Sequence, residues 1–135
     1  MPLIAQMFAV IAAILHIWFF VLESIVWRRP TTWRRFRVAS QEDADTIAPM
    51  ARNQGYYNLF LALGVLFGVL TAYPEGDFLH LGDGGSGEAI ALFGCLVMVG
   101  AGVVLVLGDR RFLPAALIQA VPPGLAVVTA VVLNS

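Results

Sequence analysis

Residues 51–70 read ARNQGYYNLFLALGVLFGVL, a polar beginning followed at once by a long apolar run. The run from Tyr56 to Tyr73 is close to the roughly 20 residues that a helix needs to cross a bilayer. An arginine, two asparagines and a glutamine lie at or just before the start of this run. Placing such side chains at membrane depth costs free energy. The stretch therefore predicts a membrane helix with an unusual concentration of hydrogen-bonding groups at one end.

The composition of the whole chain is that of an integral membrane protein. Of its 135 residues, 59% are hydrophobic and 13% are charged, whereas soluble domains carry about 25% charged residues. The length leaves room for one compact bundle, so we predict a single transmembrane domain over residues 1–135. A net charge of −1 argues against nucleic acid as a partner, and the single Cys95 excludes a disulfide framework.

Three further stretches are long and apolar enough to cross a membrane. None shows the in–out alternation of barrel strands, and all are too long for such strands, so their backbone groups must be paired within helices. The first lacks the charged start of a signal peptide and exceeds its usual apolar length, so we expect it to be retained. We predict an all-α membrane protein, a four-transmembrane-helix bundle, with helices at about 3–27, 56–73, 89–107 and 112–133.

The arginines indicate the orientation of these helices. All eight basic residues are arginines; six lie between the first two predicted spans and two between the last two. The positive-inside rule then places both arginine-rich loops in the cytoplasm and both termini outside. We expect the protein in the bacterial cytoplasmic (inner) membrane. The arginine cluster could also bind anionic lipid, although control of topology explains it equally well.

The first arginine-rich loop carries signals of local structure. Ser40 lies three residues before Asp43, a variant of the capping box, which predicts a short surface helix at about 41–48. Pro49 suits the first turn of the second long helix, where its missing N–H has no partner to lose. Trp27 and Trp33, next to arginines, are typical of interfacial anchors.

The remaining loop and the cysteine and histidine content favour no metal site. The outer loop over residues 74–88 holds Asp83 and Glu88 among glycines but lacks the ligand spacing of a calcium loop, so we interpret it as a flexible connector. His80 belongs to no motif. No Cys/His cluster has metal-ligand spacing, and His16 as a haem ligand would have no partner histidine. The sequence predicts no metal and names no cofactor.

Two ionisable residues lie inside the first predicted span. His16 and Glu23 are seven residues apart, nearly two helical turns, so an ideal α-helix places them on one face about 10 Å apart. Ionisable residues at membrane depth rarely face lipid and commonly mark functional sites. A water, a ligand or a neighbouring side chain could bridge this pair.

Polar residues of three predicted helices converge in the cytoplasmic half of the bilayer. Beside His16 and Glu23 we expect one polar cavity lined by Arg52, Asn53, Gln54, Tyr57, Asn58 and Gln119. The alternative is a structural network, because buried amides in membrane bundles often only bond across helices, at about 0.6 kcal/mol each. Gly64 and Gly68 form GxxxG, a helix-packing pattern that serves contacts within a chain or between chains.

Three segments together resemble a known family. LHIWFFVLESIVW (residues 15–27), ARNQGYYNLFLALGVLFG (51–68) and LIQAVPPGLAVV (117–128) resemble the DUF1304 family of small four-helix membrane proteins, over nearly the whole chain. The resemblance implies the same topology and marks the same polar residues, but it supplies no reaction. A looser likeness is to the MAPEG family of trimeric membrane proteins, which act on lipophilic substrates with glutathione. The glutamate of that pattern is absent here, with Tyr57 or Asn58 near its place, which puts glutathione binding in doubt.

Three kinds of function fit these residues. The first, which we favour, is a polytopic membrane protein that binds a small polar or amphipathic ligand in a cavity open to the cytoplasmic side. The second is a MAPEG-like membrane enzyme on a lipophilic substrate, with Glu23 or His16 as general acid or base. The third is a structural or accessory subunit. The expected partners are the lipid bilayer, a small molecule and further copies of the chain, as a homodimer or homotrimer.

Overall fold

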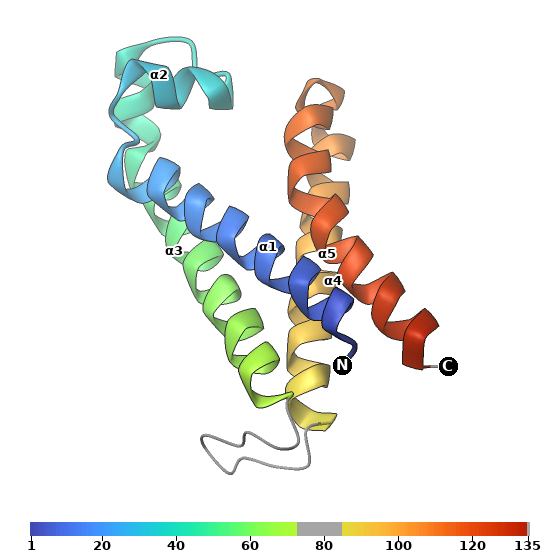
Figure 1. The fold of residues 1–135 in the computed structure, drawn as a ribbon. Coiled ribbons are helices and arrows are strands. Elements are labelled where there is room, and N and C mark those ends of the chain that lie inside the picture. Colours follow the sequence, from blue (N-terminus) through green and yellow to red (C-terminus); the bar gives the residue numbers. More distant parts are fainter. Residues whose placement is uncertain (73–84, 135) are drawn as a thin grey trace. The chain divides into compact units, whose positions relative to one another are not determined.

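The computed structural model describes residues 1–72 and 85–134, and these are almost entirely helical. In chain order (Figure 1), the elements are α1 (Leu3–Phe20), the π-helical turn η1 (Val21–Ile25), α2 (Pro30–Trp33), the 3-10 turn η2 (Arg34–Phe36), α3 (Gln41–Thr71), α4 (Gly85–Gly108), the 3-10 turn η3 (Arg110–Phe112) and α5 (Leu113–Asn134). The predicted outer loop lies largely outside the described residues, apart from its last part in α4.

Among the described residues, four helical stretches are long and apolar enough to cross a membrane, which confirms the all-α, four-helix prediction. They are Leu3–Ile25, Gln41–Thr71, Gly85–Gly108 and Arg110–Asn134. Each begins or ends within a few residues of its predicted bounds except the second, which begins well before Tyr56. The length and apolar composition of the runs were sufficient to predict these helices, because within a bilayer the backbone groups can bond only to one another.

The surface helix and the second span are one helix. The 31 residues of α3 run from Gln41 to Thr71 with Pro49 in the interior, so the predicted break at Pro49 is wrong. An internal proline costs about 3 kcal/mol in an isolated helix. Here the segment before Pro49 is held by packing. Ala44 is fully buried in a cluster with Trp27 and Trp33, and Ala48 packs against this cluster.

The predicted helix start is confirmed. The backbone N–H of Asp43 donates to Ser40 Oγ at 3.1 Å, and the Ser40 hydroxyl donates to the Asp43 carboxylate at 2.8 Å. The hydroxyl thus satisfies an amide that the first helical turn leaves without an intrahelical partner.

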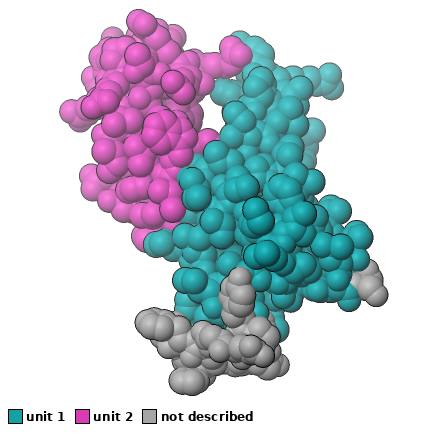
Figure 2. All heavy atoms as spheres, in the orientation of Figure 1, with its two compact units in different colours: residues 1–15, 62–135 teal, residues 16–61 magenta. Residues whose placement is uncertain are grey.

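The chain forms two compact units (Figure 2). Unit 1 contains Met1–Leu15 and Ala62–Ser135, and unit 2 contains His16–Leu61. Helix α3 contributes its first two thirds to unit 2 and its last turns to unit 1. The single transmembrane domain stays a prediction.

Small residues let the helices of unit 1 approach closely. A Cβ added at Gly68 would lie 2.5 Å from the backbone nitrogen of Ala91, and one added at Gly102 would lie 2.9 Å from the Cβ of Ala120. Gly64, the other glycine of the GxxxG pattern, has open space around it. The packing pattern is therefore used at Gly68 within the chain, as is common where helices meet in membrane proteins.

Gly102 offers a test of this packing. We expect Gly102→Val to destabilise unit 1 by about 1–3 kcal/mol, because the side chain overpacks the contact between α4 and α5. Gly100→Val is the matched control on the same helix, since nothing lies within 4 Å of a Cβ at Gly100. Cys95 is buried, so a thiol-reactive dye that labels it on heating reports unfolding in detergent. Equal melting temperatures for the two variants would contradict the close contact at Gly102.

Candidate functional site

Glu23 lies in the middle of a π-helical turn. The backbone N–H of Val26 donates to the carbonyl of Val21 at 3.0 Å, a bond that spans five residues instead of four. Such turns re-aim side chains and occur frequently at functional sites. The ideal α-helical count from His16 therefore does not hold through Glu23. The Glu23 side chain is buried, with only 9% of its surface exposed.

Gly55 allows the π turn to pack against α3, which explains why a glycine stands within the polar stretch. A Cβ on Gly55 would lie 3.0 Å from the Cβ of Glu23 and 3.2 Å from the carbonyl oxygen of Phe20, and it would clash with Ser24 Oγ. At this crossing the Ser24 hydroxyl donates to the backbone carbonyl of Arg52 at 2.9 Å. Only glycine allows the two backbones to come this close.

Asn58 holds the Glu23 carboxyl group. Its Nδ2 donates to Oε2 of Glu23 at 2.7 Å, across 35 residues of sequence. A hydrogen bond to a charged or partly buried carboxyl group is among the stronger ones, at about 1.5–3 kcal/mol. The predicted meeting of Glu23 with the polar start of the second span is thus realised through Asn58.

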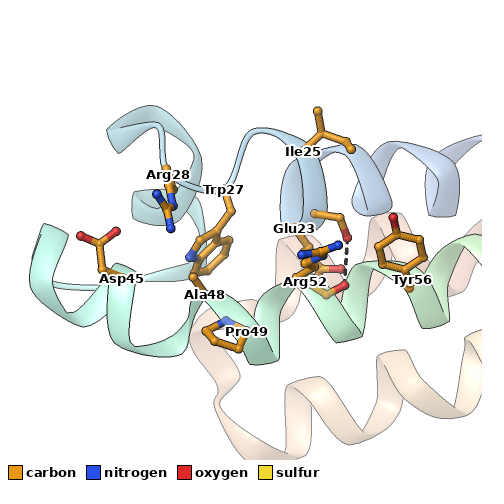
Figure 3. A pocket seen from close by; sticks show the side chains of 10 residues that line it. Glu23, Ile25, Trp27, Arg28, Asp45, Ala48, Pro49, Arg52 and Tyr56 are labelled. Atoms are coloured by element: carbon orange, nitrogen blue, oxygen red, sulfur yellow. Dashed lines mark hydrogen bonds between the residues drawn. The ribbon is translucent and has the colours of Figure 1, made fainter.

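A pocket of about 550 Å³ opens beside this pair within unit 2. Its volume falls in the range of roughly 300–1,000 Å³ that is usual for small-molecule sites. Residues of the π turn, of the segment after it and of one face of α3 form its walls (Figure 3), namely Glu23, Ser24, Ile25, Trp27, Arg28, Asp45, Ala48, Pro49, Arg52 and Tyr56.

The pocket carries charges of both signs. Figure 3 shows Arg28 and Asp45 toward one end and Glu23, Arg52 and Tyr56 toward the other. The Arg52 guanidinium carbon lies 6.0 Å from the centre of the Tyr56 ring, within reach of a cation–π interaction. In the described part of the chain no ion pair engages Arg28 or Arg52. Arg52 and Glu23 therefore line the same pocket without forming an ion pair with each other.

The model of one protein family, described as a protein of unknown function (DUF1304), matches residues 10–131. The chain belongs to the DUF1304 family. The match includes the π turn, α3 and every residue of the pocket. Comparison with curated proteins and with solved structures found no match. The likeness to the MAPEG family stays a resemblance.

Two tryptophans of this DUF1304 protein have a different role from the predicted one. Trp27 and Trp33 are only 6% and 4% exposed, so they are not anchors that face lipid headgroups. Trp27 Nε1 donates to the carbonyl of Ala44 at 2.9 Å, and Trp33 Nε1 donates to Oε1 of Gln41 at 3.2 Å. With Ala44 they form a buried cluster that fixes the first half of α3, and Trp27 is also a wall of the pocket.

The other residues predicted to line the cavity are not walls of the pocket. His16 is 1% exposed, and its ring packs edge-on against Phe19 with centroids 5.4 Å apart. Asn53, Gln54 and Tyr57 are exposed, and none of them is a wall of the pocket. Gln119 lies on α5 in unit 1, and its place in a shared cavity stays a prediction. Glu23, Arg52 and Asn58 are the predicted residues gathered around the pocket.

Sequence reasoning missed Trp27, Arg28, Asp45, Pro49 and Tyr56 as pocket residues. A signal existed, because Asp45, Pro49, Arg52 and Tyr56 recur every three to four residues and so share one helix face. The prediction divided this face in two by ending the surface helix before Pro49. Among the described residues no group of three or more His, Cys, Asp or Glu side chains could hold a metal ion.

Proposed function

We propose that this DUF1304 protein binds a small polar or amphipathic molecule in the pocket beside Glu23. One observation carries the proposal: a nearly buried carboxyl group, bonded by Asn58, borders a pocket of about 550 Å³ at the end of an apolar helix. An ionisable group in such a position is a functional-site hypothesis by default. A structural network alone does not require a pocket beside it.

The proposal includes a cellular setting. In this proposal the arginine-rich loops face the cytoplasm and both termini face outward, in the bacterial inner membrane, because the arginines lie in only two of the three predicted loops. Trp27 and Arg28 come at the end of the first apolar run, and Asp45 comes before the second, so all three lie near the first arginine-rich loop. The pocket accordingly opens toward the cytoplasm.

Glu23→Gln tests the proposal by removing the charge while keeping the shape. The glutamine carbonyl can still accept the hydrogen bond from Asn58, so we expect the variant to fold. We expect native mass spectrometry in mild detergent to show a reproducible non-lipid or lipid adduct on the wild-type protein that falls about tenfold or more in Glu23→Gln, as loss of a charged hydrogen-bond acceptor predicts.

Glu42→Gln is the matched control, since Glu42 is exposed on the first turn of α3 and lies outside the pocket. We expect it to keep the full adduct. Wild-type protein that carries no adduct, or an adduct that both variants retain equally, would favour the structural network. The same spectra give the subunit count, where we expect a dimer or a trimer.

A further inference from the structure

Two arginines line the pocket. Arg28 follows the π turn and Arg52 lies on α3; both side chains are exposed and both line the pocket. In the described ranges neither guanidinium forms an ion pair. A guanidinium is always charged and offers five N–H donors in a planar fork that matches a phosphate or carboxylate. An anionic group is therefore the natural partner at these positions.

Arg52 has neighbours on both its side chain and its backbone. Its guanidinium lies over the Tyr56 ring, and its backbone carbonyl is held by the Ser24 hydroxyl. Tyr56 in turn packs edge-on against Phe20, with ring centroids 5.2 Å apart. The cation is thus positioned by side chains from the same crossing that positions Glu23.

Glu23 supplies the complementary group near the same end of the pocket. Asn58 donates to Oε2, and a carboxylate has sites for further donors on both oxygens. A ligand that places an anion at Arg52 can therefore present a hydroxyl or ammonium donor to Glu23. A ligand that satisfies both residues must carry an anionic group and, a short distance away, a hydrogen-bond donor.

By length and composition, the pocket borders the end of an apolar span. The apolar span Leu3–Ile25 ends at Ile25, which is itself a wall of the pocket and is 64% exposed. The hydrocarbon core of a bilayer is about 30 Å thick, and the headgroups begin where an apolar span ends. A phosphate ester carried on an acyl chain would reach Arg52 with its headgroup while its chain stays beside the exposed apolar surface.

We propose that the pocket binds a phosphate ester that carries a neighbouring hydroxyl or ammonium group, with the phosphate at Arg52 and the donor at Glu23. This inference rests on the proposed function and specifies its ligand class. The same chemistry occurs in phospholipid headgroups and in soluble phosphate esters. The apolar span that ends at the pocket favours the lipid as the source.

Three probes distinguish the sources by native mass spectrometry of the purified full chain. They are dioleoyl phosphatidylethanolamine, dioleoyl phosphatidylcholine, whose quaternary ammonium cannot donate a hydrogen bond, and soluble phosphoethanolamine. We expect phosphatidylethanolamine to bind about tenfold more tightly than phosphatidylcholine, from the loss of a charged hydrogen bond. Tighter binding of phosphoethanolamine than of either lipid would keep the chemistry and assign a soluble source.

Arg52→Gln tests the phosphate contact, with Arg35→Gln as the matched control. Arg35 is an exposed arginine of the 3-10 turn η2 in the same unit, and it lies outside the pocket. We expect Arg52→Gln to weaken phosphatidylethanolamine about tenfold and Arg52→Lys to restore part of the affinity, because lysine keeps the charge but not the fork. A thermal melt identical to wild type establishes that the variants are folded.

Equal binding of the two lipids, together with equal effects of Arg52→Gln and Arg35→Gln, would overturn this inference. If a different adduct still disappeared in Glu23→Gln, the proposed ligand-binding function would stand and only the ligand class would fall. If no adduct appeared at all, both would fall.

Discussion

Replacing Trp27 by alanine is expected to lower the free energy of unfolding by about 3–5 kcal/mol, the range for removing a large aromatic side chain from a packed core. Trp27 is 6% exposed and lies at the centre of the cluster with Trp33 and Ala44. Its indole N–H also satisfies the Ala44 carbonyl. The substitution therefore leaves a cavity and removes a hydrogen bond from the turn of α3 that precedes Pro49.

Circular dichroism during unfolding with a denaturing detergent would measure this loss. Trp18→Ala is the matched control, because Trp18 belongs to the same unit but is 50% exposed. Trp27→Phe separates the two contributions: it keeps most of the buried area and loses the N–H donor, so we expect a loss near 1 kcal/mol beyond the change in packing. Similar losses for Trp27→Ala and Trp18→Ala would show that the buried cluster does not hold α3.

A side chain at Gly55 is expected to separate the π turn from α3. Gly55→Leu should destabilise unit 2 by about 3 kcal/mol, the upper end of the usual range for overpacking. The obstacles are rigid, since they include the backbone carbonyl of Phe20 and the Cβ of Glu23. We also expect the variant to lose the adduct of the wild-type protein, because the bond between Asn58 and Glu23 depends on this crossing.

Gly64→Leu is the control for helix propensity, since it makes the same exchange on the same helix at a position with open space. We expect Gly64→Leu to be neutral or slightly stabilising. A double-mutant cycle sharpens the test: Ser24→Ala removes the atom nearest to a Cβ at Gly55 and should relieve part of the destabilisation by Gly55→Ala. Strictly additive effects of Ser24→Ala and Gly55→Ala would contradict direct contact between these residues.

The sequence identified Glu23 and Asn58 as candidate site residues, but it did not identify the contact between them. Glu23 and Asn58 meet in a single hydrogen bond although they lie in different segments of the sequence. Each was recognisable as a polar residue in an apolar context. Their partnership was recognisable only as a shared depth, because sequence spacing says nothing about which helices are neighbours.

The π turn was outside the reach of sequence reasoning. Hydrophobic periodicity distinguishes a helix from a strand, but it does not detect one turn closed over five residues. Counting from His16 with an ideal α-helix placed both ionisable residues on one face. In the structure His16 packs against Phe19, whereas Glu23 borders the pocket.

The polar beginning of residues 51–70, which lies within α3, shows the same division. Asn53, Gln54 and Tyr57 were expected in the cavity because they are polar, yet they are exposed. Tyr56 was not expected there, yet it lines the pocket with Arg52, four residues before it on the same face. Polarity identified the stretch, and the rotation of the helix selected which of its residues face the π turn.

The sequence by itself determined the four membrane-length helices that lie in the described part of the chain, and it determined that Ser40 caps α3. These features depend on composition and on bonds between residues close in the chain, because lipid and the first turn of a helix each demand local partners. Only the tertiary structure decided that α3 continues through Pro49, that Trp27 is buried, and that Gly55 admits the π turn. Those outcomes depend on contacts between distant segments, and packing there outweighs what proline or tryptophan favours locally.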